Sequence, residues 1–256
     1  MKILKKSKSL RTKMNQNWLN NAEANHFWIL WRFKILLRLI KTNNIILNKK
    51  NKIMDLGCGN GILSNQIESR FNIKIDRVDS NFETLKLNRN VKGRLICYDI
   101  SKRNKKYKNY YDYIFLFDVI EHVKNDKKFI ENALFHLKNN GSLIINVPSI
   151  QILYSRYDIA VGHLRRYDKK LFYKTIKKTM INKISMNYWG FMLLPILFLR
   201  KIVLVFYNKK NYNNIVKSGW KTNSIINIFM KSLMNIEIKI FKKQILGSSL
   251  MVILTK

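Results

Sequence analysis

Four aspartates each end a short apolar run that has the composition of a β-strand. They are Asp55, Asp79, Asp99 and Asp118. The carboxyl ends of the strands form the ligand crevice of an open parallel sheet, so we expect these carboxylates to converge on one small molecule. The chain has only 15 acidic residues against 49 Lys and Arg, and acids at four equivalent positions therefore indicate a function.

A glycine-rich turn follows the first of these strands. Its sequence is Asp-Leu-Gly-Cys-Gly-Asn-Gly, in which Gly57, Gly59 and Gly61 allow the backbone to turn tightly and to approach a ligand. A dinucleotide fingerprint would require a glycine where the chain has Ile62, and a P-loop is excluded because no Gly-Lys-Ser/Thr follows. Asp79, about twenty residues further on, is suited to bind a ribose diol, so a ribose-containing ligand is predicted.

Apolar runs and helical segments alternate from residue 52 onward, which predicts a parallel sheet covered by helices on both faces. We predict an α/β, doubly wound, Rossmann-like fold with a seven-stranded, mostly parallel sheet and helical elaborations at both ends of the chain. The predicted strands are 52–56, 75–78, 94–98, 111–117, 142–147, 183–188 and 248–255. The predicted helices include 62–70, 82–88 and 127–138, preceded by an amphipathic helix over 25–40.

The length of 256 residues suits one domain. Residues 1–22 carry six Lys or Arg and no acid, so we expect a flexible basic tail there and the domain proper over 23–256. Within it, the polar segment 149–170 is predicted to contact a substrate, and 186–245 to form an apolar and basic helical insertion. Two cysteines are too few for a disulfide framework, which favours a reducing, cytoplasmic compartment.

The net charge of +34 favours an anionic partner such as nucleic acid or acidic lipid headgroups. Residues 169–231 contain thirteen Lys or Arg and no acid, and an apolar run over 186–207 lies within them. Arg200 and Lys201 divide this run into pieces shorter than the roughly 20 residues that cross a bilayer. Apolar surface flanked by cations is typical of a helix that lies on an anionic membrane, and the alternative is a buried core helix inside a lid.

Four motifs occur in order along the predicted sheet. They are Ile53-Met-Asp-Leu-Gly-Cys-Gly-Asn-Gly61, Val78-Asp79, Tyr98-Asp99-Ile100 and Tyr111-Asp-Tyr-Ile-Phe-Leu-Phe-Asp-Val-Ile-Glu-His-Val123. This series resembles the successive motifs of class I S-adenosylmethionine-dependent methyltransferases, and the resemblance implies S-adenosylmethionine as the cofactor.

The resemblance also implies a role for each motif residue. Asp55 and the three glycines of the turn would hold the methionine end of the cofactor, and Asp79 would bind the ribose hydroxyls. Asp99 and Ile100 would bind the adenine, and Asp118 would lie beside the reactive sulfonium. Several carboxylates and no phosphate clamp suit a cationic cofactor that carries an amino group and a diol.

Three further motifs extend the resemblance to most of residues 20–256. They are Asn25-His-Phe-Trp-Ile-Leu-Trp-Arg32, Gly162-His-Leu-Arg-Arg-Tyr-Asp168 and Leu246-Gly-Ser-Ser-Leu250. They look like those of a methyltransferase subgroup that bacteria often carry beside glycan or polyprenol-lipid genes. This resemblance narrows the class of enzyme more than its acceptor. From the apolar and basic region 186–210 we expect methyl transfer, as O-methylation, to a small or lipid-linked acceptor at the cytoplasmic face of the membrane.

Asp118, Glu121 and His122 form an Asp-x-x-Glu-His set and are candidate catalytic residues. The set is similar to the Glu-x-x-Glu-His of ubiquinone-pathway O-methyltransferases, where it is associated with a magnesium ion. Asp118 replaces the family's glutamate, so we expect no metal, and the alternative is a magnesium site on these three residues. His163 is a candidate general base because imidazole titrates near neutral pH.

An arginine pair follows His163. Arg165, Arg166 and Tyr167 are candidate substrate-binding residues, since a planar guanidinium suits a phosphate or carboxylate on the acceptor. The alternative is that Asp158 and Asp168 pair with these arginines structurally.

Two other functions stay open at this point. An RNA methyltransferase would use the positive charge, but the chain has Asp-Val-Ile-Glu where an Asn-Pro-Pro-Tyr base-acceptor motif would stand, and it shows no added RNA-binding module. A membrane-associated, non-catalytic scaffold could retain a relic fold, but the intact glycine turn and the four acids favour an enzyme.

Overall fold

The computed structural model describes residues 2–10, 23–177, 179–206 and 223–256. In this part of the chain, one eight-stranded sheet has the order β1-β4-β3-β2-β5-β6-β8-β7. The strands are β1 (Ile3–Lys5), β2 (Ile53–Leu56), β3 (Asp76–Asp79), β4 (Leu95–Cys97), β5 (Tyr111–Phe117), β6 (Leu137–Pro148), β7 (Lys183–Trp189) and β8 (Ser249–Thr255). All neighbours pair in parallel except β6 with β8 and β7 with β8, so the predicted mostly parallel α/β sheet is confirmed.

The predicted count of seven strands is too low by one. Strand β1 lies in the segment predicted to be a flexible tail and pairs in parallel with the edge strand β4. Ile3 packs against the small cluster that contains Leu95 and the two cysteines, Cys58 and Cys97, both of which are free and buried. Strand β1 has only three residues and lies among lysines, so it shows no alternation of apolar and polar residues. The sequence therefore does not predict this strand. Residues 11–22 of the predicted tail lie outside the described residues.

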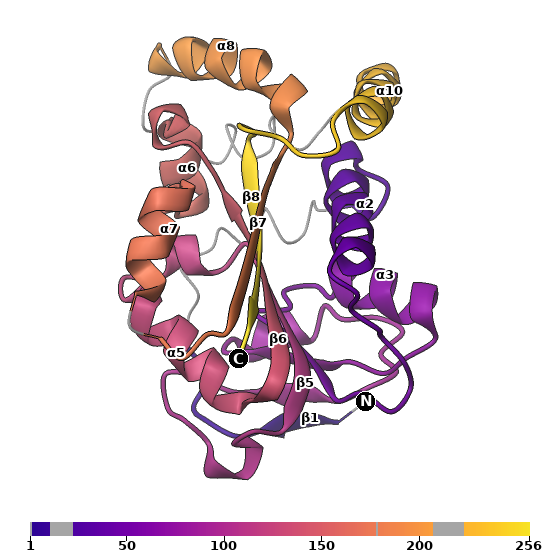
Figure 1. Cartoon of the computed structure of the whole chain (residues 1–256), viewed down its shortest axis with the longest axis vertical. Coiled ribbons are helices and arrows are strands. Elements are labelled where there is room, and N and C mark those ends of the chain that lie inside the picture. The colour runs from indigo at the N-terminus through magenta and orange to yellow at the C-terminus, as the bar shows by residue number, and fades with distance from the viewer. Residues whose placement is uncertain (1, 11–22, 178, 207–222) are drawn as a thin grey trace.

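Helices cover both sides of the sheet. Figure 1 shows α5, α6 and α7 on one side, and α2, α3 and α10 on the other. The helices are α2 (Phe27–Thr42), α3 (Ile62–Phe71), α4 (Phe82–Leu85), α5 (Asp126–His136), α6 (Arg156–Val161), α7 (Lys169–Ile176), α8 (Leu194–Val205) and α10 (Ser224–Ile240). Short 3-10 helices are η1 (Lys105–Tyr107), η2 (Ile120–His122), η3 (Gln151–Leu153) and η4 (Phe191–Leu193).

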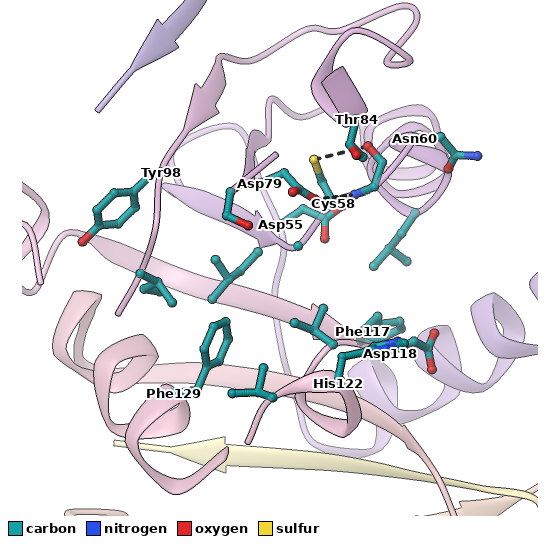
Figure 2. Close-up of a pocket in the computed structure, with 18 of the residues that line it drawn as sticks. Asp55, Cys58, Asn60, Asp79, Thr84, Tyr98, Phe117, Asp118, His122 and Phe129 are labelled. Carbon is teal, nitrogen blue, oxygen red and sulfur yellow. Dashed lines mark hydrogen bonds between the residues drawn. The ribbon is translucent and has the colours of Figure 1, made fainter. Parts of the chain in front are cut away.

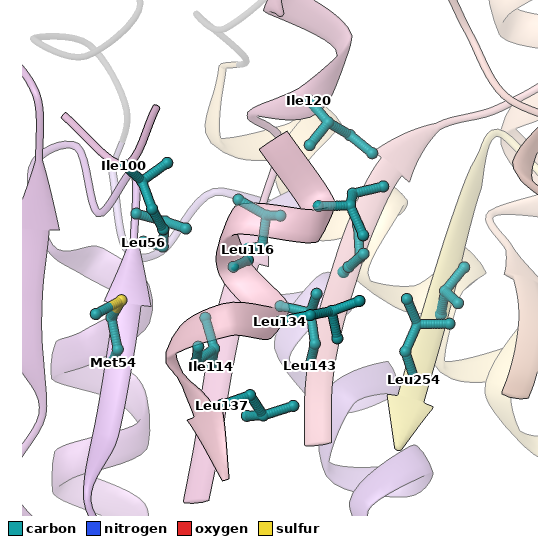
Figure 3. Close-up of a cluster of buried hydrophobic side chains, with 14 of the residues drawn as sticks. Met54, Leu56, Ile100, Ile114, Leu116, Ile120, Leu134, Leu137, Leu143 and Leu254 are labelled. Carbon is teal, nitrogen blue, oxygen red and sulfur yellow. The ribbon is translucent and has the colours of Figure 1, made fainter. Parts of the chain in front are cut away.

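The central strands are buried on both faces, as expected for a parallel sheet between helical layers. In β6, Leu143 and Ile145 belong to the apolar cluster under α5, while Ile144 belongs to the cluster under α2. Figure 3 shows the first cluster, in which side chains of α5 meet those of β2, β5, β6 and β8. The two clusters fix the central strands, and with them the strand ends that carry the predicted acids.

The predicted insertion 186–245 divides into three described parts. Its first residues belong to β7, and α8 and α10 follow, with 207–222 outside the described residues. Glu237 of α10 is fully buried and accepts hydrogen bonds from the N–H groups of Gly190 (2.9 Å) and Met192 (2.8 Å). These bonds attach α10 to the turn between β7 and α8. Among the described helices, none has both the length and the apolar character needed to cross a bilayer.

Candidate active site

A cavity of about 430 Å³ opens at the carboxyl ends of β2, β3, β4 and β5. All four aspartates singled out in the sequence line it. Figure 2 shows Asp55 and Asp79 on one side of the cavity, and Phe129 and His122 on the other. The parallel sheet therefore brings together side chains that are up to 63 positions apart in the sequence, Asp55 to Asp118.

The glycine turn borders this cavity with Gly57 and Gly59. Gly57 has φ +74°, and a Cβ there would lie 2.5 Å from Cγ2 of Val119. Gly61 does not line the cavity. It has φ +79°, and a Cβ there would lie 2.1 Å from Oδ1 of Asn88 and 2.6 Å from Nη1 of the buried Arg77. Gly61 is thus required by packing behind the turn, whereas Gly57 and Gly59 offer backbone to a ligand.

Asp55 and Asp79 are buried carboxylates that form no ion pair within the described chain. Asp55 accepts a hydrogen bond from the hydroxyl of Ser64 (2.6 Å), and Asp79 accepts from the N–H groups of Asn81 (2.8 Å) and Gly59 (3.3 Å). Burial raises the pKa of each of the two carboxyl groups to about 6. Both retain lone pairs for further donors, so a ligand with an amino group or hydroxyls would relieve the cost of their burial.

The far end of the cavity is apolar with one carboxylate at its border. Ile100 and Phe129 line it, and Ile100 is nearly inaccessible to solvent. Asp99 is held at the rim, because its carboxylate accepts from the N–H of Ser101 (3.0 Å) and its own N–H donates to Oγ of Ser7 (2.8 Å). An apolar slot with a polar group at the edge suits a planar heterocycle.

Two lining residues carry no recognisable sequence signal. Phe129 belongs to α5 and reads as an ordinary core residue, and Thr84 of α4 follows no motif. The hydroxyl of Thr84 is buried and has no hydrogen-bond partner within the described residues. A buried donor and acceptor without a partner in the wall of a cavity is a candidate ligand contact.

Asp118 ends β5 with φ +57°, and Arg32 of α2 forms a buried ion pair with it. Asn146 of β6 donates to the other carboxylate oxygen (2.7 Å), and the indole N–H of Trp189 in turn donates to Asn146 (2.9 Å). The Arg32 guanidinium lies 5.0 Å from the ring centre of Trp28, so aromatic packing also fixes it. The sequence motif Asn25 to Arg32 contains this arginine, but only the fold shows its partner.

A second cavity, of about 320 Å³, adjoins the first and shares Asp118 and His122 with it. The side chains that line it come from the start of α2 and from α6, η4, α8 and α10, and most of them are apolar. The polar exceptions include Glu121, His163 and Arg166. Two adjoining cavities with a common wall can hold two reactants side by side.

His163 is held by a buried aspartate. Its Nδ1 atom lies 2.8 Å from Oδ1 of Asp158, and Arg166 donates to both oxygens of the same carboxylate (2.9 and 3.1 Å). Burial opposes ionisation of Asp158, but the hydrogen bond from His163 and the charge of Arg166 lower its pKa to about 2. An ionised Asp158 fixes the proton of His163 on Nδ1 and leaves Nε2 as an acceptor.

Burial shifts the pKa of Glu121 and that of His122 in the direction that favours the neutral form of each. Glu121 is fully buried without a hydrogen-bond partner for either oxygen, and burial together with the charge of Asp118 raises its pKa well above the usual value. Burial, and then the neighbouring His163, lower the pKa of His122 to about 4. The Nδ1 atom of His122 lies 3.0 Å from the carbonyl oxygen of Gly162, to which a neutral ring donates.

The alternative magnesium site of Asp118, Glu121 and His122 does not assemble. Within the described residues, the one group of three potential ligands consists of Glu121, His122 and His163, whose ligand atoms lie within 4.8 Å of one another. Asp118 is excluded because Arg32 and Asn146 bind its carboxylate. This group offers a single carboxylate, whereas magnesium prefers oxygen ligands.

The charged side chains of the predicted substrate segment 149–170 form ion pairs within the segment and with α5. Arg165 donates to Asp126 (2.7 Å), and the hydroxyl of the buried Tyr167 donates to the same carboxylate (2.7 Å). Neither residue lines either cavity. Arg166 does line the second cavity, but its guanidinium is bound to Asp158. Of the two structural pairings left open by the sequence, the structure shows that of Asp158, with Arg166. Asp168 instead accepts from the N–H of Leu171 (2.6 Å) as the N-cap of α7, and Arg165 pairs with Asp126.

Comparison with known proteins gives a family match and a set of relatives. The family described as methyltransferase domain matches residues 27–191. The ubiquinone biosynthesis O-methyltransferase of Rickettsia prowazekii (strain Madrid E) is 32% identical over 154 residues, which are 56% of this chain and 59% of that protein. The mitochondrial ubiquinone biosynthesis O-methyltransferase of Schizosaccharomyces pombe is 24% identical over 144 residues, 54% of this chain and 52% of that protein. The chain thus spans less than two thirds of the curated relatives it matches.

Solved structures share the fold. Haemonchus contortus phosphoethanolamine N-methyltransferase 2, solved with S-adenosyl-L-methionine, superposes with a TM-score of 0.55 at 18% identity, over 86% of this chain and 52% of that one. A SAM-dependent methyltransferase from Archaeoglobus fulgidus gives a TM-score of 0.52 at 14% identity, over 86% of this chain and 93% of that one.

Proposed function

The chain belongs to the methyltransferase domain family, and we propose that it methylates an oxygen atom of a largely apolar small-molecule or lipid-linked acceptor bound in the second cavity. It is an S-adenosylmethionine-dependent methyltransferase. The observation that carries the proposal is the shared wall of the two cavities, in which Asp118 and His122 separate a crevice lined by carboxylates from an apolar pocket.

The first cavity fits the cofactor by the chemistry of its walls. Asp55 and the backbone of Gly57 and Gly59 would hold the amino acid part, and Asp79 would accept both ribose hydroxyls. Asp99 and Ile100 would hold the adenine. The buried hydroxyl of Thr84 has no partner in the described chain and offers one more contact. When bound, the cofactor supplies an electrophilic methyl group.

His163 is the proposed general base. Asp158 holds its Nδ1 proton, so Nε2 would accept the proton that leaves the acceptor hydroxyl. The cofactor held in the first cavity would supply the methyl group and keep the electron pair of its broken S–C bond as a neutral thioether. Glu121 lies 3.9 Å from Nε2, and burial raises its pKa, which disfavours the anion that would compete for that proton. The remaining task of the protein is alignment of the acceptor oxygen with the methyl group across the shared wall.

The relatives support oxygen as the acceptor atom. Two ubiquinone biosynthesis O-methyltransferases match 56% and 54% of this chain, at 32% and 24% identity. We extend their reaction type, O-methylation, to this chain. We infer an apolar acceptor from the second cavity, because side chains of α8, α10 and η4 in its wall are mainly apolar.

A membrane face is the proposed place of action. Helices α8 and α10 lie at the same end of the molecule (Figure 1), and both contribute to the wall of the second cavity. They also expose many apolar side chains. They are Ile196, Phe198, Leu199, Ile202, Val203 and Val205 on α8, and Ile225, Ile226, Ile228, Phe229, Ile236 and Ile240 on α10. Exposed apolar patches with basic flanks are typical of peripheral membrane contact, here at the cytoplasmic leaflet.

Methyl transfer is tested with radiolabelled S-adenosylmethionine. The purified chain is incubated with organic extracts of cells that lack the gene, and products are analysed by mass spectrometry for the addition of one methylene unit. We expect a methylated, chloroform-soluble product with an ether linkage. A product only in the aqueous or RNA fraction would overturn the proposed acceptor class.

Membrane contact is tested by flotation with vesicles of phosphatidylglycerol and phosphatidylcholine. Ile202→Asp places a charge on the exposed face of α8, and Ile46→Asp, on a residue 70% exposed that lies outside these helices, is the matched control. We expect the wild type and the control to float and Ile202→Asp to sediment. Equal flotation of both variants would overturn the membrane face.

A further inference from the structure

Arg200 of α8 stands out among the residues that line the second cavity. Its guanidinium lies 3.7 Å from the ring centre of Tyr157 on α6, which fixes its plane. Its Nη2 atom is buried and has no hydrogen-bond partner within the described residues. A buried guanidinium nitrogen without an acceptor is costly, and such a group in the wall of a cavity indicates a ligand oxygen.

The other charges in the wall of this cavity cancel. Arg166 is paired with Asp158, and Asp118 is paired with Arg32. Burial lowers the pKa of His26 and of His122 to about 4, which leaves both rings uncharged at neutral pH. Burial, and then the charge of Asp118, raise the pKa of Glu121, which disfavours its ionised form.

Arg200 is therefore the cation without a counter-charge among the described Asp, Glu, Lys and Arg residues that line the cavity. Its ring contact is with Tyr157, and apolar side chains such as Ile196 and Leu197 share the cavity wall with it. In such surroundings a cation attracts an anion more strongly than it does in water. The cavity thus combines an apolar wall with a single positive site.

We propose that Arg200 binds an anionic group, a carboxylate or a phosphate, on the apolar acceptor. The inference rests on the proposed function and specifies its substrate class: an amphipathic acceptor with one anionic group near the hydroxyl that is methylated. The sequence assigns anion binding to Arg165 and Arg166, but these residues pair with Asp126 and Asp158. We assign anion binding to Arg200 on α8 instead. A guanidinium suits either anion because its planar N–H groups can bind two oxygens at once.

The test measures binding of hexyl phosphate, hexanoate and hexanol to the full chain saturated with S-adenosylhomocysteine, by calorimetry. The three probes have the same apolar tail and differ only in the head group. We expect at least one of the two anions to bind about tenfold more tightly than hexanol. Arg200→Ala should remove this preference and leave hexanol binding unchanged, and Arg200→Lys should restore part of it. Whichever of hexyl phosphate and hexanoate binds more tightly identifies the anionic group of the acceptor as a phosphate or a carboxylate.

Lys49→Ala is the control for net charge, since Lys49 is exposed and lines neither cavity. It should bind all three probes as the wild type does. Equal binding of hexanol and both anions, or anion binding that survives Arg200→Ala, would overturn the proposal. The proposal would also be overturned if Arg200→Ala lost flotation on phosphatidylglycerol vesicles and still bound the anions. Arg200 would then contact lipid headgroups and not the acceptor. Failure of the proposed function is distinguishable, because it appears as the absence of methyl transfer to any extract.

Discussion

Arg32 on the helix that precedes the sheet and Asp118 at the end of β5 form a buried ion pair in the wall of the cofactor crevice. The pair links α2 to the sheet at a point where the carboxylate also borders the second cavity. It gives the N-terminal helix a role in shaping both reactant sites, beyond its packing on the core.

Arg32→Ala should destabilise the protein by about 3 kcal/mol, because it leaves the Asp118 carboxylate buried without its cation. Urea unfolding measures the loss. Arg38→Ala, on the same helix, removes only a hydrogen bond to the carbonyl of Phe241 (2.8 Å) and should cost about 1 kcal/mol. The double variant Arg32→Ala/Asp118→Asn should recover part of the stability. Equal losses for Arg32→Ala and Arg38→Ala would show that the ion pair contributes nothing specific.

Asp55→Asn should stabilise the protein at neutral pH when no cofactor is present. Burial raises the pKa of Asp55 from 3.8 to about 6, which corresponds to a cost of about 3 kcal/mol for the ionised form. The folded state holds the proton more tightly than the unfolded state, so the wild type loses this stability as pH rises from about 4 to about 6. The advantage of Asp55→Asn over the wild type, measured by urea unfolding, should therefore grow across this range and level off above it. An advantage that does not change with pH would contradict the burial cost.

Asp79→Ala should abolish binding of S-adenosylhomocysteine, because the carboxylate is the proposed acceptor for the ribose hydroxyls. Burial raises its pKa to about 6, so wild-type affinity should also fall as pH drops below about 6 and the group takes up a proton. Calorimetry at pH 5 and pH 8 measures both effects. Glu83→Ala, an exposed acid on the adjoining α4 that lines neither cavity, is the control and should bind as the wild type does. Unchanged affinity of Asp79→Ala would sink the assignment of the crevice.

His163→Gln should reduce methyl transfer about 100-fold while leaving binding of the cofactor product unchanged, since general base catalysis contributes factors of that order. The assay is incorporation of radiolabelled methyl into chloroform-soluble product. Activity of the variant should recover at high pH, where the acceptor hydroxyl ionises without help. The control is His136→Gln, because His136 is buried and lines neither cavity. Equal activity losses for the two histidine variants would leave no specific role for His163.

Gly61→Ala should destabilise the protein by about 2 kcal/mol or more through backbone strain and through contact with the side chains of Asn88 and Arg77. Thermal unfolding measures this effect. Because Gly61 does not line the cofactor crevice, the folded fraction should retain its affinity for S-adenosylhomocysteine. Asn88→Ala in the same chain removes the atom nearest to the new Cβ, and should restore part of the loss. No recovery in the double variant would locate the cost in the backbone alone.

The sequence predicts the central sheet well because each strand is an apolar run with a polar residue at its end. The same regularity places the four aspartates at one edge, and all four line one cavity. Strand β1 escapes prediction because three residues are too few for a pattern, and its pairing with β4 depends on contacts about 90 positions away.

The second cavity shows the limit of sequence reasoning. The Arg-Arg pair suggested an anion site, but whether an arginine is free depends on which carboxylates lie beside it, and these come from α5 and α6. In the sequence, Arg200 only interrupts an apolar run, and nothing there indicates a binding role for it. Its position over Tyr157 requires α6 and α8 to meet, which no local pattern encodes.

The edge strand β1 has a practical consequence for work with this protein. Beyond it, Leu10 donates a backbone hydrogen bond to the carbonyl of Ser80 (2.9 Å), and its side chain lines the cofactor crevice. Ser9 accepts from the N–H of Phe82 (3.0 Å) in the same region. A recombinant version that begins translation at Met14 would lack this whole strip, uncovering the edge of β4 and one side of the crevice.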